Sequence, residues 1–224
     1  MTEKSIKELC SEVFPFWSSL SDEQITNLLR STQKISFERG TNIHDGGECT
    51  GIILVKSGSL RVYMLSEDGK EVTLYRLFAG DISILSASCV LNSITFDVFV
   101  DAEEDSECVI VGGCAFAELC ENSHEAQVFA LESALACFSD VMWVMQQILF
   151  MSLDKRLAIF LLDEMAQQGS DTIKLTHEQI AKYMGSAREV VSRMVKYFAT
   201  EGIVESSRGG IRVLDKPKLR KIAG

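Results

Sequence analysis

The stretch SHEAQVFALESALACFSDVMWVMQQILF, residues 123–150, carries the longest regular pattern in the chain. Its large apolar residues recur at alternating spacings of three and four, which places them along one side of an α-helix. We call this set the first stripe; it comprises Val128, Leu131, Leu135, Phe138, Met142, Met145 and Leu149. A second stripe with the same kind of spacing comprises Ala134, Cys137, Val141, Val144 and Ile148.

Two adjacent stripes predict a helix that is covered on two sides. At ~1.5 Å per residue this helix is about 40 Å long, which is more than one small domain covers. We therefore predict that the first stripe is a homodimer interface and that the second stripe packs against the helix's own domain. The alternative is a core helix of a larger monomeric bundle.

The composition is that of an ordinary globular protein, since 46% of the 224 residues are hydrophobic and 24% are charged. The N-terminus has no charged-then-apolar leader, and polar residues such as Asp140 and Gln146 interrupt the long helix. We therefore expect a cytoplasmic protein without membrane contact. The seven cysteines are scattered and form no C-x-x-C pair, so we expect neither a disulfide framework nor a metal site.

The net charge of −10 hides a division of the chain. From Asp171 onward there are 11 basic and 6 acidic residues, whereas the remainder has 11 basic and 26 acidic residues. An acidic front with a basic tail indicates a nucleic-acid partner for the tail. An exposed basic face without such a partner is the alternative.

Between Lys34 and about Glu118 the sequence consists of short runs, separated by glycine, in which apolar and polar residues alternate. A hairpin turn is expected at Asp68-Gly69. Many short strands at regular turn spacing predict a jelly-roll β-barrel. A short helical connector, residues 114–120, leads to the long helix. Before the strands, Ser21 and Gln24 form a capping box for a short helix that reaches about Arg30.

After the long helix, Ser152 is expected to cap a new helix that ends near Gly169. We place the domain boundary here, with residues 1–150 as a β-roll plus the long dimerisation helix (about 123–150) and residues 151–224 as the second domain. The fold class is therefore α+β.

The second domain contains two expected capping boxes, Thr176 with Gln179 and Ser186 with Glu189, on either side of Gly185. Two short helices around a glycine turn, followed by a hairpin at about residues 203–214, predict a winged helix-turn-helix. On the second helix, polar side chains share one face. The candidate DNA-binding residues are Thr176, Ser186, Arg188, Glu189, Ser192, Arg193 and Lys196.

This order of elements, with SAREVVSR in the second helix, resembles the Crp/Fnr family of bacterial transcription regulators over about residues 14–214. The resemblance implies a homodimer that binds an inverted repeat of double-stranded DNA with TGA-containing half-sites. It also implies contact with RNA polymerase and control by an effector bound in a cyclic-nucleotide-binding-like β-roll.

The effector itself stays open. In the cyclic AMP receptor a glutamate and an arginine hold the nucleotide, but here no Lys or Arg stands between Arg76 and Lys155, so we expect no cyclic AMP. The candidate pocket is apolar and small-polar, and it could equally be core. Its residues are Ile84, Leu85, Ser86, Ser88, Cys89, Phe96, Phe138 and Met142.

No nucleophile, P-loop or H-E-x-x-H motif is present, so we expect no enzyme. A redox, haem or metal-based sensor on the same scaffold remains an alternative, with Cys89 or His44 as candidates, although no metal or haem is expected. A β-roll adaptor that binds protein and not DNA is another.

Overall fold

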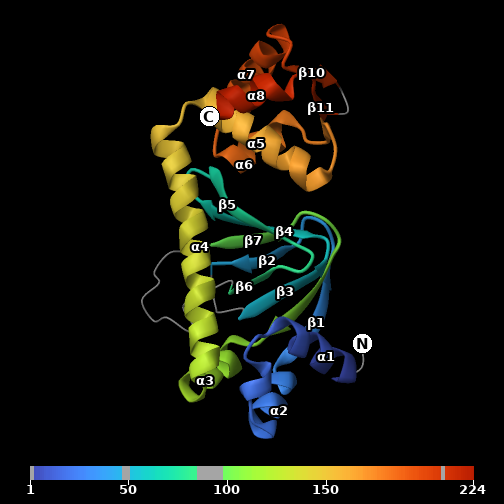
Figure 1. The fold of residues 1–224 in the computed structure, drawn as a ribbon, viewed down its shortest axis with the longest axis vertical. Helices are drawn as coiled ribbons and strands as arrows, with labels where there is room; N and C mark the ends of the chain where they lie inside the picture. Colours follow the sequence, from blue (N-terminus) through green and yellow to red (C-terminus); the bar gives the residue numbers. More distant parts are fainter. Residues whose placement is uncertain (1–2, 47–50, 85–97, 208–209) are drawn as a thin grey trace. The chain divides into compact units, whose positions relative to one another are not determined.

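The computed structural model describes residues 3–46, 51–84, 98–207 and 210–224. Contacts divide the chain into two compact units. The first unit comprises Met1–Met64 with Leu74–Val141, and the second comprises Leu65–Thr73 with Met142–Gly224. We describe each unit by itself (Figure 1).

The first unit begins with helices that the sequence predicted only in part. Helix α2 (Asp22–Arg30) has the expected capping box, in which Ser21 Oγ accepts a hydrogen bond from the backbone amide of Gln24 at 3.2 Å. Helix α1 (Glu3–Val13) and the 3₁₀ turn Trp17–Ser19 were not predicted. They are held by an aromatic cluster in which Phe14 and Phe16 pack against rings from the α3 and α4 segments.

Among the described residues, eight strands of the first unit form two four-stranded antiparallel sheets, which confirms the predicted jelly-roll architecture. The sheet orders are β1-β8-β3-β6 and β2-β7-β4-β5 (Figure 1). The strands are β1 (Thr32–Phe37), β2 (Asn42–Asp45), β3 (Ile52–Ser57), β4 (Ser59–Leu65), β5 (Glu71–Phe78), β6 (Ile82–Ile84), β7 (Phe99–Ala102) and β8 (Ser106–Val111). Apolar side chains from both sheets, such as Ile53 and Val62, form a common buried core.

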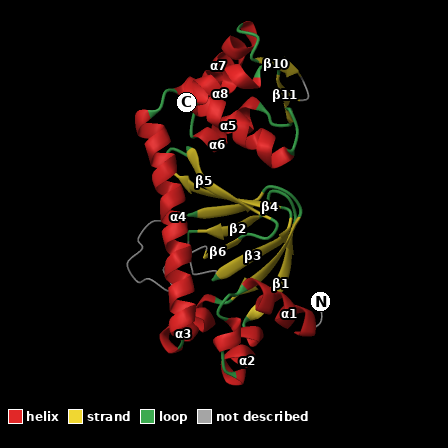
Figure 2. Cartoon of the chain, in the orientation of Figure 1, coloured by secondary structure: helices red, strands yellow, loops and turns green. Residues whose placement is uncertain are grey.

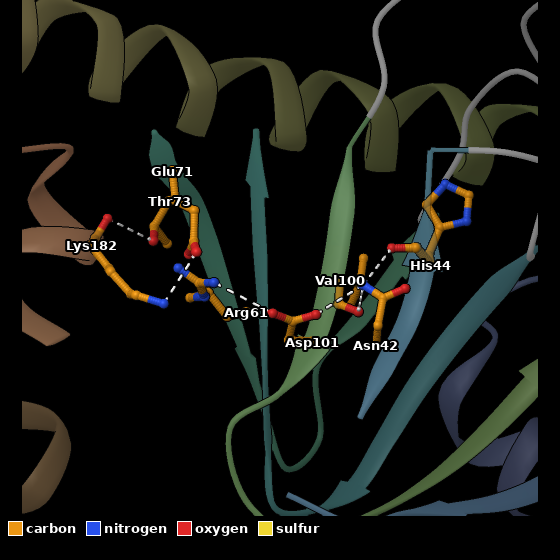
Figure 3. Close-up of polar contacts among 8 residues, drawn as sticks. All are labelled: Asn42, His44, Arg61, Glu71, Thr73, Val100, Asp101 and Lys182. Carbon is orange, nitrogen blue, oxygen red and sulfur yellow. Dashed lines mark hydrogen bonds and ion pairs between the residues drawn. The ribbon is translucent and has the colours of Figure 1, made fainter. Parts of the chain in front are cut away.

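Polar side chains tie the strands of the second sheet together. The β2–β7 pairing contains an irregularity after Asn42, and the Asn42 side-chain amide donates to the carbonyls of His44 and Val100 (Figure 3). The same amide donates to Asp101, which also accepts from Arg61. The carbonyls at this bulge are therefore hydrogen-bonded by a side chain, as buried backbone groups require.

Helix α3 (Gly113–Asn122) is the predicted connector, and α4 (His124–Phe150) is the predicted long helix. All seven residues of the first stripe are exposed in the single chain, by 37% at Val128 and up to 67% at Leu135. The second stripe is half-buried except at Ile148, and Val141 packs against the core between the sheets. Only Ala126 and Ala130 of α4 are fully buried, so the described residues leave the larger apolar face of this helix exposed.

The second unit holds the predicted helix-turn-helix and wing, together with two elements that the sequence did not predict (Figure 2). The strand β9 adds a third strand to the wing, in the order β10-β11-β9, and the C-terminal α8 packs on α5. The elements are α5 (Leu153–Gln168), β9 (Thr172–Ile173), α6 (His177–Met184), α7 (Arg188–Thr200), β10 (Val204–Ser207), β11 (Gly210–Val213) and α8 (Lys216–Ala223). Their buried side chains, Leu161, Ile180 and Phe198 among them, share one core.

Candidate nucleic-acid interface

Helix α6 begins and ends as its sequence predicts. The Thr176 hydroxyl accepts a hydrogen bond from the backbone amide of Gln179 at 3.2 Å. In return, Gln179 Oε1 accepts a hydrogen bond from the backbone amide of Thr176 at 2.9 Å. At the other end Gly185 has φ +57°, the left-handed conformation that suits glycine and stops a helix. The first half of the helix-turn-helix is therefore fixed by local sequence.

The predicted capping box at Ser186 is wrong. The N-cap of α7 is Ala187, and its side chain makes no capping bond. The amide of Ser186 donates instead to the carbonyl of Ala181 at 2.9 Å, so this residue completes the C-terminal capping of α6. Because the left-handed turn uses Ser186 in this way, α7 starts one residue later and Glu189 falls at its second position.

Helix α7 separates its polar and apolar residues clearly. Val191, Val195 and Phe198 are buried in the core of the second unit, as predicted. The opposite face carries the candidate DNA-binding side chains; Arg188, Glu189, Arg193 and Lys196 are exposed and Ser192 is half-buried. The positions i, i+1, i+4, i+5 and i+8 lie on one side of an α-helix.

Tertiary contacts that the sequence did not reveal hold the turn between the two helices. A guanidinium N–H of Arg156, on α5, donates to the carbonyl of Met184 at the end of α6. Burial lowers the pKa of Arg156. These contacts join residues far apart in the sequence, so no local signal could have found them.

The tip of the β4–β5 hairpin belongs to the same unit and contacts the same turn. Lys182 Nζ lies 3.1 Å from Glu71 Oε1, and the Thr73 hydroxyl donates to the Lys182 carbonyl at 3.3 Å (Figure 3). Val72 lies under Gly185, where an added Cβ would approach its methyl group to 3.1 Å. A larger residue at the turn is therefore opposed by both backbone conformation and space.

A groove of about 390 Å³ lies between the start of α6, the start of α7 and the wing. We call it the wing groove. It is lined by residues that include Lys174, Thr176, His177, Glu178, Arg188, Ser206 and Ser207. Two of the predicted DNA-binding residues, Thr176 and Arg188, thus share one concave surface with hydroxyl groups of the wing.

The predicted effector pocket is described only in part. Leu85, Ser86, Ser88, Cys89 and Phe96 lie outside the described residues. Ile84 is buried in the cluster that contains Phe14 and Phe116, whereas Phe138 and Met142 lie on the exposed first stripe. The buried cluster around Ile84 thus includes neither Phe138 nor Met142.

Cys137 of the second stripe lies close to two polar side chains of the strands β5 and β6. The Tyr75 hydroxyl is 3.3 Å from Ser83 Oγ, which is 3.9 Å from Cys137 Sγ. Burial, and secondly the neighbouring Cys137, raise the pKa of Tyr75. This side of the β-roll thus carries polar as well as apolar side chains.

Arg61 and Arg76 are the two arginines that precede residues 77–154, the stretch without Lys or Arg, and both are engaged in ion pairs. Arg61 Nη2 lies 3.4 Å from Asp101 Oδ2, and Arg76 Nε lies 2.6 Å from Glu103 Oε2. Arg61 also lies over the Tyr63 ring at 4.0 Å. Both cations are therefore neutralised by carboxylates of their own unit.

Three of the cysteines in the part of the chain that is described, Cys10, Cys108 and Cys120, are buried, and Cys114 is exposed. Within it, no group of three or more His, Cys, Asp or Glu side chains is placed to hold a metal ion. Burial raises the pKa of Cys10, Cys108 and Cys120 to about 11, so these thiols stay protonated at neutral pH. His44 is buried on strand β2.

Helix α4 is long and apolar enough to cross a membrane by length and composition. A single helix of this kind is weak evidence, because a helix that pairs with another copy has the same composition. Asp140 lies near its centre, and burial raises the pKa of this carboxyl.

Two family models match the chain. Residues 34–123 match the cyclic nucleotide-binding domain, and residues 155–222 match the Crp-like helix-turn-helix domain. A solved structure from Eubacterium rectale, assigned to the Crp/Fnr family of transcriptional regulators, is 43% identical. The similarity covers 95% of this chain and 99% of that one, with a TM-score of 0.89.

Two curated proteins also match nearly the whole chain, at lower sequence identity. The protein of Lacticaseibacillus casei named "Probable transcriptional regulator flp" is 25% identical over 96% of this chain and 98% of its own length. The cyclic AMP receptor protein of Thermus thermophilus is 27% identical over 93% of this chain and 96% of its own length.

Proposed function

The chain belongs to the Crp/Fnr family of transcriptional regulators, and from this premise we propose that it binds DNA as a homodimer joined through α4. The observation that carries DNA binding is the face of α7. Arg188, Glu189 and Arg193 are exposed there, while the opposite face is buried in the core. A helix anchored in this way can enter the major groove without unfolding its own domain.

The bases that α7 contacts follow from the chemistry of its side chains. Arginine donates to guanine O6 and N7, and glutamate accepts from cytosine N4. Each half-site is therefore proposed to contain TGA, in an inverted TGA/TCA repeat. Because a twofold dimer presents two such helices, the half-sites are proposed to lie about one helical turn, ~34 Å, apart.

The dimer is proposed to form along the first stripe of α4. Seven large apolar side chains at heptad spacing are exposed in the single chain, and a soluble protein seldom exposes so long an apolar strip without a partner. Pairing of two copies also accounts for the hydropathy of α4 without a membrane. The protein is accordingly proposed to act in the cytoplasm, with RNA polymerase as its protein partner.

The effector is proposed to be something other than a cyclic nucleotide. The residues from Leu77 to Asp154 include no Lys or Arg, and Arg61 and Arg76 are engaged with carboxylates. A buried cyclic phosphate without a guanidinium partner is costly. The match to the cyclic nucleotide-binding domain is therefore attributed to the fold of the β-roll.

A randomised-site selection with the purified full-length protein tests the DNA proposal. An enriched inverted TGA/TCA repeat, bound with an affinity that falls steeply with salt, is the expected result. Absence of any enriched sequence, with no salt-dependent binding to duplex DNA, would favour an adaptor that binds protein.

Calorimetry with cyclic AMP and cyclic GMP tests the effector proposal separately. No heat of binding is expected at micromolar concentrations. Micromolar binding of either nucleotide would overturn the proposal, and it would require that Arg61 or Arg76 leave its carboxylate partner to meet the phosphate.

A further inference from the structure

Two aromatic side chains of α4 are exposed although they belong to neither stripe. Trp143 and Phe150 each directly follow a residue of the first stripe, and they are seven residues apart. Residues at this spacing lie on the same side of a helix. Phe150 is 81% exposed and Trp143 is exposed as well, so the described residues leave both rings uncovered. We call this pair the aromatic flank.

The aromatic flank lies on the side of α4 that faces away from the helix's own β-roll. In heptad notation the first stripe occupies positions a and d, and the second stripe occupies positions c and g. Two residues of the second stripe, Cys137 and Val141, lie against the β-roll of the same chain. Trp143 and Phe150 are at position b, which together with position e forms the other flank of the a/d seam.

The symmetry of the proposed dimer decides what faces the aromatic flank. Two helix-turn-helix modules that bind one duplex require the two α4 helices to pair in parallel. In a parallel pair, position e of one helix lies next to position g of the other. Because the c and g flank carries the β-roll in each copy, the β-roll of the second copy lies beside the aromatic flank of the first.

The β4–β5 hairpin is the part of the β-roll at the matching level along α4. The end of this hairpin, Leu65–Thr73, belongs to the same compact unit as α4 from Met142 onward (Figure 1). Met64 and Leu65, where β4 enters the hairpin, are exposed apolar side chains. By symmetry, the hairpin of the second copy reaches the level of the paired helices at which the aromatic flank lies.

We propose that Met64 and Leu65 of one copy pack on Trp143 and Phe150 of the other. This inference rests on the proposed homodimer, and it extends the interface beyond the first stripe. Methionine and leucine make favourable contacts with aromatic rings, and a soluble protein seldom leaves large apolar groups of this kind uncovered. The second copy fits better than an unrelated protein, because pairing of the first stripes already holds its hairpin beside the aromatic flank.

The same hairpin also contacts the helix-turn-helix of its own chain. Glu71 is paired with Lys182 at the end of α6, and Val72 lies under Gly185 in the turn. Each helix-turn-helix turn is therefore linked, through its hairpin, to the α4 helix of the other copy.

Thiol cross-linking between two different chains tests the contact. One chain carries Glu67→Cys on the hairpin, and the other carries Gln146→Cys, at an exposed e position between the two rings. Both carry Cys114→Ser, because Cys114 is exposed. After subunit exchange, a short bismaleimide should yield a covalent two-chain product. Since each chain has a single introduced thiol, a link between the introduced thiols forms only across the interface.

Glu132→Cys is the matched control for Gln146→Cys. Glu132 is also exposed at an e position, two heptads earlier and about 21 Å along the helix. Its mixture with the Glu67→Cys chain should give no more product than chains without introduced thiols. Equal cross-linking at both positions, or at neither in a protein that sediments as a dimer, overturns the proposed contact.

The fluorescence of Trp143 gives a second readout. The chain has two tryptophans, so Trp17→Phe leaves Trp143 as the only one. In the dimer its emission should be that of a buried indole, and it should shift to longer wavelength when Met64→Gln and Leu65→Gln are added. This hairpin variant should also raise the dissociation constant of the dimer about a hundredfold, because two symmetric contacts each lose apolar burial.

The outcomes separate the contact from the proposed dimer. A dimer in which Trp143 emits as a solvent-exposed indole overturns the contact and leaves the pairing of the first stripes intact. A buried Trp143 that does not respond to the hairpin variant has another occupant, such as a different protein, and also overturns it. A protein that sediments as a monomer at every concentration overturns the proposed homodimer itself.

Discussion

Helices α4 and α7 leave faces of different chemistry exposed. Helix α7 buries Val191, Val195 and Phe198 in its own unit and exposes charged side chains. Helix α4 instead exposes large apolar residues, with Leu135 at 67% and Phe138 at 60%. The face that a helix leaves open indicates the chemistry of its partner, which is apolar for α4 and charged for α7.

The largest effect is expected from charges on the exposed face of α4. The double variant Leu135→Lys with Met142→Lys should be monomeric in sedimentation, since each large side chain loses about 1.5–3 kcal/mol of burial and each charge would be desolvated. Ala136→Lys, which adds a charge at an exposed position outside both stripes, should remain dimeric. A dimer that persists in the double variant would place the interface elsewhere.

The second-largest effect is expected from a substitution on the buried face of α7. Phe198 is fully buried, so Phe198→Ala should lower the free energy of unfolding of the winged helix by about 3–5 kcal/mol. Its neighbour Tyr197 is 53% exposed, and Tyr197→Ala should change the unfolding free energy by less than about 0.5 kcal/mol. Equal losses in the two variants, measured by denaturant titration, would contradict the assignment of the faces.

The exposed face of α7 should give a smaller effect on specificity. Glu189→Ala removes the acceptor for cytosine N4 and should relax the choice at a single G·C pair, by about 1–3 kcal/mol of discrimination. A randomised-site selection on the variant measures this loss. An unchanged preferred sequence would mean that Glu189 does not contact a base.

Lys196 should give the smallest effect. It lies two turns along the same exposed face, where a lysine suits a backbone phosphate. Lys196→Ala should weaken binding to all duplexes alike and flatten the salt slope by about one unit. A change in sequence preference, seen in the same selection, would instead assign Lys196 to a base.

Some of the fold could be predicted because the signals are local. The heptad spacing of 123–150, the capping box at Thr176 and the turn glycine Gly185 each act within a few residues, and each is present as expected. The alternation of apolar residues between glycines likewise gave the double-sheet β-roll. A face or a turn of this kind is set by side-chain period and by backbone conformation.

The elements that were missed depend on distant partners. Helix α8 is a short basic segment, and it is held by Leu219 in the core and by ion pairs from Lys216 to Asp171 and from Lys218 to Glu201. The failed capping box at Ser186 has a similar origin, because that residue is already used by the end of α6. The spacing of residues along the sequence could reveal neither the distant partners of α8 nor the use of Ser186 at the end of α6.

The sequence by itself determined the two stripes of α4 and the polar face of α7, since these depend on periodicity alone. Only the tertiary structure decided that Arg61 and Arg76 are engaged by carboxylates and that His177 shares a groove with Arg188 and the wing. The physical reason is that burial, ion pairing and concave surfaces depend on residues that meet only after folding.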